Sequence, residues 1–229
     1  MPLVSFDLDG TLVACREART RSFEAVRSDL EASVPVPSVE AYQEAFRAAL
    51  ADRLPETARD GPVRRAAFDH AFCAAGADVS ASTVEAFADA YRRRRLDRID
   101  PVTGALDLLA ELDDPVVIVT NGPAGLQREK LRITGLSPHV DATVVAGRCG
   151  VLKPDPEPFE VAIDRVNAST TDGIHVGDTR PDVEGALAAG LDPIVLRTDG
   201  SVPAWVPRDV PVCDSLEGVR RVLDAGARY

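Results

Sequence analysis

The chain has 229 residues, 45% of them hydrophobic, which is enough for one substantial core with a smaller appended domain. Its formal net charge of −11 argues against a nucleic-acid partner, because a phosphate backbone repels an acidic surface. The sequence has no apolar run near the ~20 residues of a membrane span and no signal-peptide pattern at its N-terminus. We therefore expect a cytoplasmic protein without a membrane partner.

The charged residues are dominated by two types: 24 of the 26 basic residues are Arg, and 24 of the 37 acidic residues are Asp. This bias is typical of adaptation to concentrated salt, where a dense acidic surface is screened. The four cysteines are far apart in the sequence, so neither a CxxC pair nor a local zinc knuckle is available, and we expect buried free thiols. The sequence shows no exposed apolar stripe, so it does not indicate the oligomeric state.

Short apolar runs rich in β-branched residues alternate with helical patterns along most of the chain. Each helical pattern between two later runs is short enough for a right-handed crossover, so the sequence predicts an α/β fold with a doubly wound parallel sheet. The expected strands are residues 3–8, 116–119, 143–145, 174–176 and 194–196.

A long interval between the first two strands holds four helical patterns and no convincing strand. The patterns are carried by Phe23/Val26/Leu30, Tyr42/Phe46/Leu50, Phe68/Phe72 and Val84/Phe87/Tyr91. The last of these helices is expected to begin at a capping box made by Ser82 and Glu85. We therefore predict an inserted helical domain over residues 14–99, with residues 1–13 and 100–229 forming the sheet domain.

Acidic, hydroxyl and amide groups directly follow three of the predicted strands. They are Asp7 and Asp9 where the first strand ends, Thr120, Asn121 and Gly122 after the second, and Asp178 and Asp182 after the fourth. Any one of these alone is typical of a helix cap or turn. Because ligands of doubly wound sheets bind at the carboxyl ends of the strands, the set together predicts a site at that edge.

Four carboxylates at one edge need a counter-charge, since each close pair repels by roughly 4 kcal/mol at an effective dielectric constant near 20. Mg²⁺ prefers such oxygen ligands. Lys153, one of only two lysines in the chain, follows the third strand and is expected to join the site. With Asp9 protonated, the remaining three carboxylates balance Mg²⁺ and Lys153.

The four stretches SFDLDGT, VTNG, GVLKPDP and GDTRPD, in this order and spacing, resemble the haloacid dehalogenase-like superfamily over residues 3–196. The resemblance implies a Rossmann-like core with strand order 5-4-1-2-3. It also implies that the helical insert is a cap that closes over the site.

Carried over to this sequence, the resemblance implies that Asp7 is the nucleophile and Asp9 the general acid and base. Thr120 and Lys153 would hold the phosphoryl group, with Asn121 and Gly122 beside them. Mg²⁺ would be bound by Asp7, the backbone carbonyl of Asp9, Asp178 and, directly or through water, Asp182. A carboxylate attacks a phosphoryl group only when its oxygens are neutralised. We therefore expect a Mg²⁺-dependent phosphatase acting on a small phosphorylated metabolite, of the phosphoglycolate or sugar-phosphate type.

Single residues argue against some of the other branches of the superfamily. Haloacid dehalogenases lack an acid two positions after the nucleophile, so Asp9 argues against them. The insert contains no lysine, which argues against a phosphonoacetaldehyde hydrolase. Phosphosugar mutases share all the named residues and remain the alternative. A non-catalytic binding protein would be expected to have lost some of these residues.

Two further features concern the substrate. Many capped relatives carry an acid-hydroxyl pair where this chain has Ala14 and Cys15, so the substrate class stays open. The run Arg92–Arg95 ends the last insert helix, where cations complement the helix dipole. Because consecutive helical residues point in different directions, we expect one or two of these arginines to face the cleft and bind an anionic part of the substrate.

Overall fold

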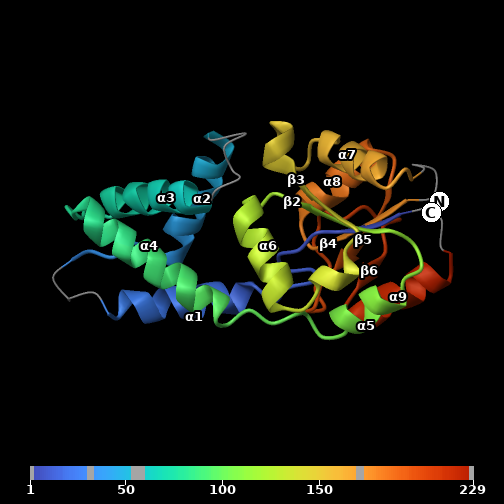
Figure 1. The fold of residues 1–229 in the computed structure, drawn as a ribbon, viewed down its shortest axis with the longest axis horizontal. Helices are drawn as coiled ribbons and strands as arrows, with labels where there is room; N and C mark the ends of the chain where they lie inside the picture. Colours follow the sequence, from blue (N-terminus) through green and yellow to red (C-terminus); the bar gives the residue numbers. More distant parts are fainter. Residues whose placement is uncertain (1–2, 30–33, 53–59, 169–172, 227–229) are drawn as a thin grey trace.

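The computed structural model describes residues 3–29, 34–52, 60–168 and 173–226 (Figure 1). In these residues six parallel strands form one sheet in the order β3-β2-β1-β4-β5-β6. The strands are β1 (Val4–Phe6), β2 (Val116–Thr120), β3 (Ala142–Val145), β4 (Ile174–Gly177), β5 (Asp192–Leu196) and β6 (Val212–Cys213). The five predicted strands and the order 5-4-1-2-3 are confirmed, whereas β6 was not predicted.

Alternation along the strands directs side chains to two different hydrophobic cores. In β2, Val116 and Ile118 belong to one core and Val117 and Val119 to the other. The first core includes residues of α5 (Ala105–Glu111), α6 (Ala124–Ile133) and α9 (Leu216–Asp224), and the second includes residues of α7 (Glu157–Arg165) and α8 (Arg180–Ala188). The sheet is therefore covered on both faces, as a doubly wound fold requires.

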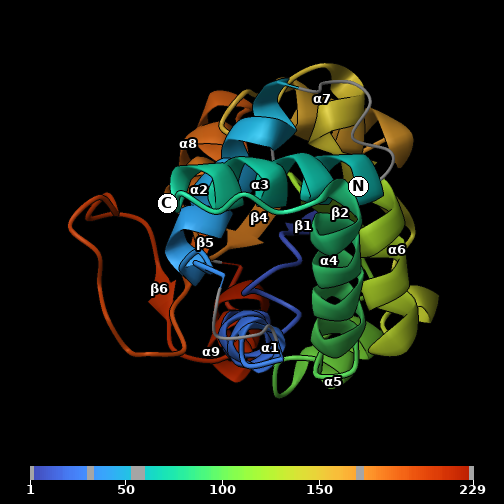
Figure 2. The ribbon, with the colours of Figure 1, turned by 90° about the vertical axis from the view of Figure 1, so that its left-hand side faces the viewer.

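Four helices, α1 (Arg16–Arg27), α2 (Val39–Asp52), α3 (Asp60–Ala74) and α4 (Ala81–Leu96), lie between β1 and β2 in the sequence. They share a third hydrophobic cluster built around stacked and edge-on rings, including Phe23, Tyr42, Phe68 and Tyr91. We call these helices the helical insert. Figures 1 and 2 show them on one side of the molecule, with α6 lying between them and the sheet.

Two details of the insert differ from, or fall outside, the sequence prediction. The α4 N-cap is Ser80, whose hydroxyl accepts the Thr83 N–H at 3.2 Å, so the predicted capping box at Ser82 is wrong. Glu85 instead pairs with Arg65 of α3. Leu30 of the first helical pattern lies outside the described residues.

The edge of the sheet that bears the motifs faces the insert. The chain passes from Asp7, at the end of β1, through a short segment into α1, and α6 follows directly after the end of β2. Helices α3 and α6 are in contact. No helix within the described ranges has the length and apolar character needed to cross a membrane.

Candidate active site

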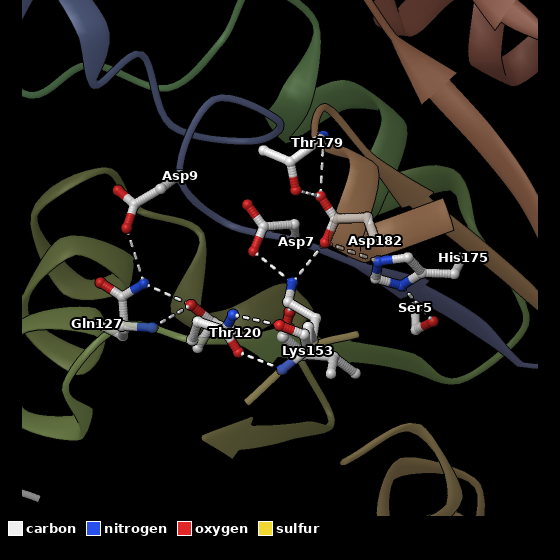
Figure 3. A network of polar contacts seen from close by, with 12 residues as sticks. Ser5, Asp7, Asp9, Thr120, Gln127, Lys153, His175, Thr179 and Asp182 are labelled. Carbon is white, nitrogen blue, oxygen red and sulfur yellow. Dashed lines mark hydrogen bonds and ion pairs between the residues drawn. The ribbon is translucent and has the colours of Figure 1, made fainter. Parts of the chain in front are cut away.

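Lys153 lies at the centre of the site, between carboxylates from two strand ends (Figure 3). Its Nζ donates to Asp7 Oδ1 at 2.8 Å, to Asp182 Oδ1 at 2.6 Å and to the Val119 carbonyl at 2.7 Å. Burial alone would lower the pKa of Lys153, but Asp182 and Asp7 outweigh it and raise that pKa. The side chain is therefore a fixed ammonium group that joins β1, β2 and α8.

Asp7 belongs to a cluster of three acids. One carboxylate oxygen each from Asp7, Asp178 and Asp182 lie within 4.8 Å of one another. Burial and the neighbouring carboxylates raise the pKa of Asp7 to about 7, although Lys153 opposes them. Burial and the charge of Asp182 raise the pKa of Asp178 to about 6. Asp178 Oδ1 is buried without a hydrogen-bond partner in the described parts of the chain. Lys153 therefore leaves part of the negative charge of the cluster unbalanced.

Gly10 lets this cluster assemble. It has a φ of +103°, and a Cβ at this position would lie 2.5 Å from a carboxylate oxygen of Asp178. Only a residue without a side chain allows the turn and the close approach together. This explains why the first motif has a glycine at position 10.

Asp182 is the most completely hydrogen-bonded acid of the cluster. Its Oδ2 accepts the Thr179 backbone N–H at 3.0 Å and the Thr179 hydroxyl, while Oδ1 accepts Lys153 and faces His175 Nε2 at 3.4 Å. Burial would raise the pKa of Asp182, but Lys153 and His175 hold it well below its usual range. This carboxylate caps α8 and orients Lys153.

The residues after β2 are largely occupied with one another. Asn121 Oδ1 accepts the Lys153 backbone N–H at 2.8 Å, and Asn121 Nδ2 donates to the Lys153 carbonyl at 3.1 Å. The Gly122 N–H and Gln127 Nε2 both donate to Thr120 Oγ1, at 3.1 and 2.7 Å. Thr120 and Gly122 lie beside Asp9 and Gln127, whereas Asn121 holds the backbone of the Lys153 loop.

Asp9 is surrounded by donors that the sequence prediction missed. Lys130 of α6 is fully buried and its Nζ lies 2.5 and 2.6 Å from the two Asp9 oxygens. Gln127 Nε2 and Cys15 Sγ donate at 2.9 and 2.6 Å, and Arg95 lies at 3.7 Å. Burial would raise the pKa of Asp9, but Lys130 and Arg95 lower it far below its usual range. The charge balance with a protonated Asp9 is therefore wrong.

One feature of the sequence could have identified Lys130, because it is one of two lysines in the chain and lies on the helix after the second motif.

Cys15 is buried beside Asp9, and burial together with that carboxylate raises the pKa of its thiol to about 11. Such a thiol is a poor nucleophile. The expectation of buried free thiols is confirmed for Cys15 and Cys213 but is wrong for Cys73, which is exposed, and for Cys149, which is half-buried.

The arginine run of α4 divides as its helical geometry predicts. Arg95 is buried against Asp9, while Arg92 pairs with Glu129 of α6 and Arg93 is exposed. The Arg92–Glu129 pair joins the helical insert to the sheet domain. At least one arginine of the run therefore faces the site.

Comparison with known proteins gives concordant results. The family model for haloacid dehalogenase-like hydrolases matches residues 1–190. The chain is 31% identical to a phosphoglycolate phosphatase of Cupriavidus necator, over 96% of this chain and 92% of that protein. It is 26% identical to a phosphoglycolate phosphatase of Caulobacter vibrioides, over 84% of this chain and 78% of that one.

Solved structures that share this fold include haloacid dehalogenases. The structure of a 2-haloacid dehalogenase from Pseudomonas syringae matches with a TM-score of 0.73 and 27% identity, covering 99% of this chain and all of that one. The sheet and the helical insert of this chain thus correspond to the fold of that dehalogenase. On these grounds the chain belongs to the haloacid dehalogenase-like hydrolases and is an enzyme of their phosphatase branch.

Proposed function

We propose that this enzyme is a Mg²⁺-dependent phosphatase of small phosphate monoesters that works through an aspartyl phosphate on Asp7. The observation that carries the proposal is the position of Lys153 between Asp7 and Asp182, beside the unpartnered oxygen of Asp178. A phosphoryl group repels an attacking anion unless its oxygens are neutralised. The site offers a carboxylate, a fixed cation and an acidic cluster within a few ångströms.

The acidic cluster fits Mg²⁺, which prefers hard oxygen ligands and usually keeps several waters. Asp7 and Asp178, with the backbone carbonyl of Asp9, would hold the ion, and Asp182 would act through water because donors already occupy its oxygens. The raised pKa values of Asp7 and Asp178 are those expected of acids that lack their cation. Bound Mg²⁺ supplies charge neutralisation to the phosphoryl oxygens.

The chemistry of the chain's own residues balances over two steps. In the structure Asp9 is ionised, and it takes up a proton when the negative charge of the bound substrate raises its pKa. The Asp7 carboxylate then attacks phosphorus, the bond to the ester oxygen breaks, and the leaving alcohol takes that proton. Water then attacks the aspartyl phosphate, passes its proton back to Asp9 and releases inorganic phosphate and free Asp7. The ion pair with Lys130 fits the ionised state of Asp9 between the two steps.

The helical insert, over residues 14–99, would act as a cap. Arg95 and the Arg92–Glu129 pair bring α4 against the site and against α6. Phosphoglycolate or a sugar phosphate is the proposed substrate, supported by the two phosphoglycolate phosphatases that resemble this chain over most of their length. The cap supplies the surface that would contact the organic part of such a substrate.

The test is phosphate release from a panel of phosphate esters with Mg²⁺ and with chelator, for the wild type and Asp7→Asn. We expect Mg²⁺-dependent turnover that falls to background in Asp7→Asn, with an unchanged circular dichroism spectrum. Asp164→Asn, at an exposed position, is the matched control. A folded Asp7→Asn protein with a tenth of the wild-type rate would contradict the mechanism. Phosphosugar conversion with little free phosphate would indicate a mutase, and metal-independent halide release from a 2-haloacid assayed in parallel would indicate a dehalogenase.

A further inference from the structure

A cavity of about 130 Å³ opens between the helical insert and α6, directly beyond Asp9. We call it the insert cavity. Its lining includes four cations, Arg19, Arg47, Arg95 and Lys130, and a single carboxylate, Asp9. The whole chain carries a net charge of −11, so this concentration of positive charge runs against its composition. A cavity with this lining favours an anion.

The charge of Asp9 does not account for the cations around it. Lys130 already contacts both Asp9 oxygens, at 2.5 and 2.6 Å, whereas Arg95 stands further away at 3.7 Å. The Arg95 side chain is only 10% exposed. A buried charge that lacks a close partner is costly, so a guanidinium held here is suited to a ligand that brings the missing negative charge.

Three polar atoms in this region lack partners. Arg95 Nε, Arg19 Nε and the Tyr91 hydroxyl are buried, and none has a hydrogen-bond partner among the residues that the structure describes. Tyr91 itself is 0% exposed and, like both arginines, lines the cavity. Buried donors are almost always satisfied in folded proteins, so their grouping at one cavity indicates a ligand that accepts hydrogen bonds.

We propose that the insert cavity binds a second anionic group of the substrate, with Arg95 as its principal contact and Arg19 and Tyr91 beside it. The inference rests on the proposed phosphatase function, because the cavity starts at Asp9, where the leaving oxygen would sit. A guanidinium binds carboxylates and phosphates alike through paired N–H donors. The preferred substrates are therefore phosphate esters whose organic part carries a carboxylate or a second phosphate.

Three phosphate esters of two-carbon alcohols separate the possibilities: 2-phosphoglycolate, ethylene glycol bisphosphate and 2-hydroxyethyl phosphate, whose organic part carries no charge. Their binding is measured by calorimetry on the Asp7→Asn background with Mg²⁺, so that turnover does not interfere. Arg95→Ala is compared with Arg93→Ala, the exposed neighbour on the same helix. Because a hydrogen bond to a charged group is worth a factor of about 10 to 100, Arg95→Ala should weaken the binding of 2-phosphoglycolate, of the bisphosphate or of both by that much more than the binding of 2-hydroxyethyl phosphate.

Each outcome is decisive. A selective loss with 2-phosphoglycolate assigns the cavity to a carboxylate, and a selective loss with the bisphosphate assigns it to a second phosphate. Equal losses for all three ligands would overturn the proposal and make Arg95 a positioning residue for Asp9. If Arg95→Ala is unfolded, Arg95→Lys and Arg19→Ala provide the same comparison.

The experiment also keeps the two proposals apart. The wild-type enzyme could release no phosphate from any ester and still show Arg95-dependent binding of 2-phosphoglycolate or of the bisphosphate. The phosphatase mechanism then fails and the anion site stands. If phosphate is released but the preference for a second anionic group is absent from both the wild type and Arg95→Ala, the phosphatase mechanism stands and the anion site fails.

Discussion

Replacing Lys130 with Met tests the electrostatic arrangement around Asp9 directly. Lys130 is fully buried on α6 and both oxygens of Asp9 lie within 2.6 Å of its Nζ. Met has nearly the same length and shape, so the change removes the charge and the hydrogen bonds while keeping most of the packing. The Asp9 carboxylate would then lose its closest cation.

The expected loss follows from the exposure of Asp9. Removing one partner of a fully buried pair costs about 3–5 kcal/mol. The Asp9 side chain is 25% exposed and keeps Gln127, Cys15 and the more distant Arg95, so we expect a smaller loss of about 2 kcal/mol in the free energy of unfolding. For a chain of this size that lowers Tm by about 4–8 °C.

A double-mutant cycle separates the ion pair from packing. Unfolding by urea is measured for Lys130→Met, Asp9→Asn and the double variant, with the exposed Arg132→Met on the same helix as control. We expect a coupling of about 1–2 kcal/mol between positions 9 and 130, and a change within about 0.5 kcal/mol for the control. Effects that add within about 0.5 kcal/mol would show that Lys130 stabilises the fold without its charge and refute the reasoning.

Two further predictions concern the acidic cluster and helix packing. Because the folded state raises the pKa of Asp7 to about 7 and of Asp178 to about 6, the metal-free protein loses their stabilisation as the pH rises from about 4 to about 7. A Mg²⁺ concentration of tenfold the Kd measured at pH 8 should then raise Tm by about 3–6 °C at pH 8. The same concentration should raise Tm by much less at pH 5, and equal shifts at both pH values would contradict this. Gly185→Ala should cost about 1–3 kcal/mol in urea unfolding, because its Cβ would lie 2.4 Å from the Phe159 ring. Gly61→Ala, with open space around it in a helix, should not destabilise, and a similar loss there would remove the steric explanation.

The fold was predictable because its signals are local. Buried parallel strands read as short β-branched runs, and β1, β2, β3, β4 and β5 all lie within two residues of their predicted positions. The strand β6 has only two residues, Val212–Cys213, after a stretch rich in proline, so no periodicity marks it. The α4 cap was misplaced by two residues because Ser80 and Ser82 both offer a suitable hydroxyl, and only the backbone geometry distinguishes them.

The site was predictable as far as its residues follow the ends of strands. Asp7, Asp178 and Lys153 come together because parallel strands end at one edge of the sheet. Lys130 and Arg95 lie on helices outside the motifs, and their meeting at Asp9 depends on how the insert packs against α6. Helical periodicity identifies a buried face but not the partner that it meets.

The positions of the two lysines explain how one short motif supplies two carboxylates with different properties. Asp7 and Asp9 are separated by one residue, yet Asp7 faces two other acids and a single lysine, whereas Asp9 faces Lys130 and Arg95. The pKa of Asp7 is raised to about 7 and that of Asp9 is lowered. Under the proposed mechanism the two acids need different neighbours: Asp7 becomes an ionised nucleophile when a cation lowers its pKa, whereas Asp9 takes up a proton when the negative charge of the substrate raises its pKa. A motif search finds both carboxylates, but the difference between their surroundings comes from Lys153, after β3, and Lys130 on α6.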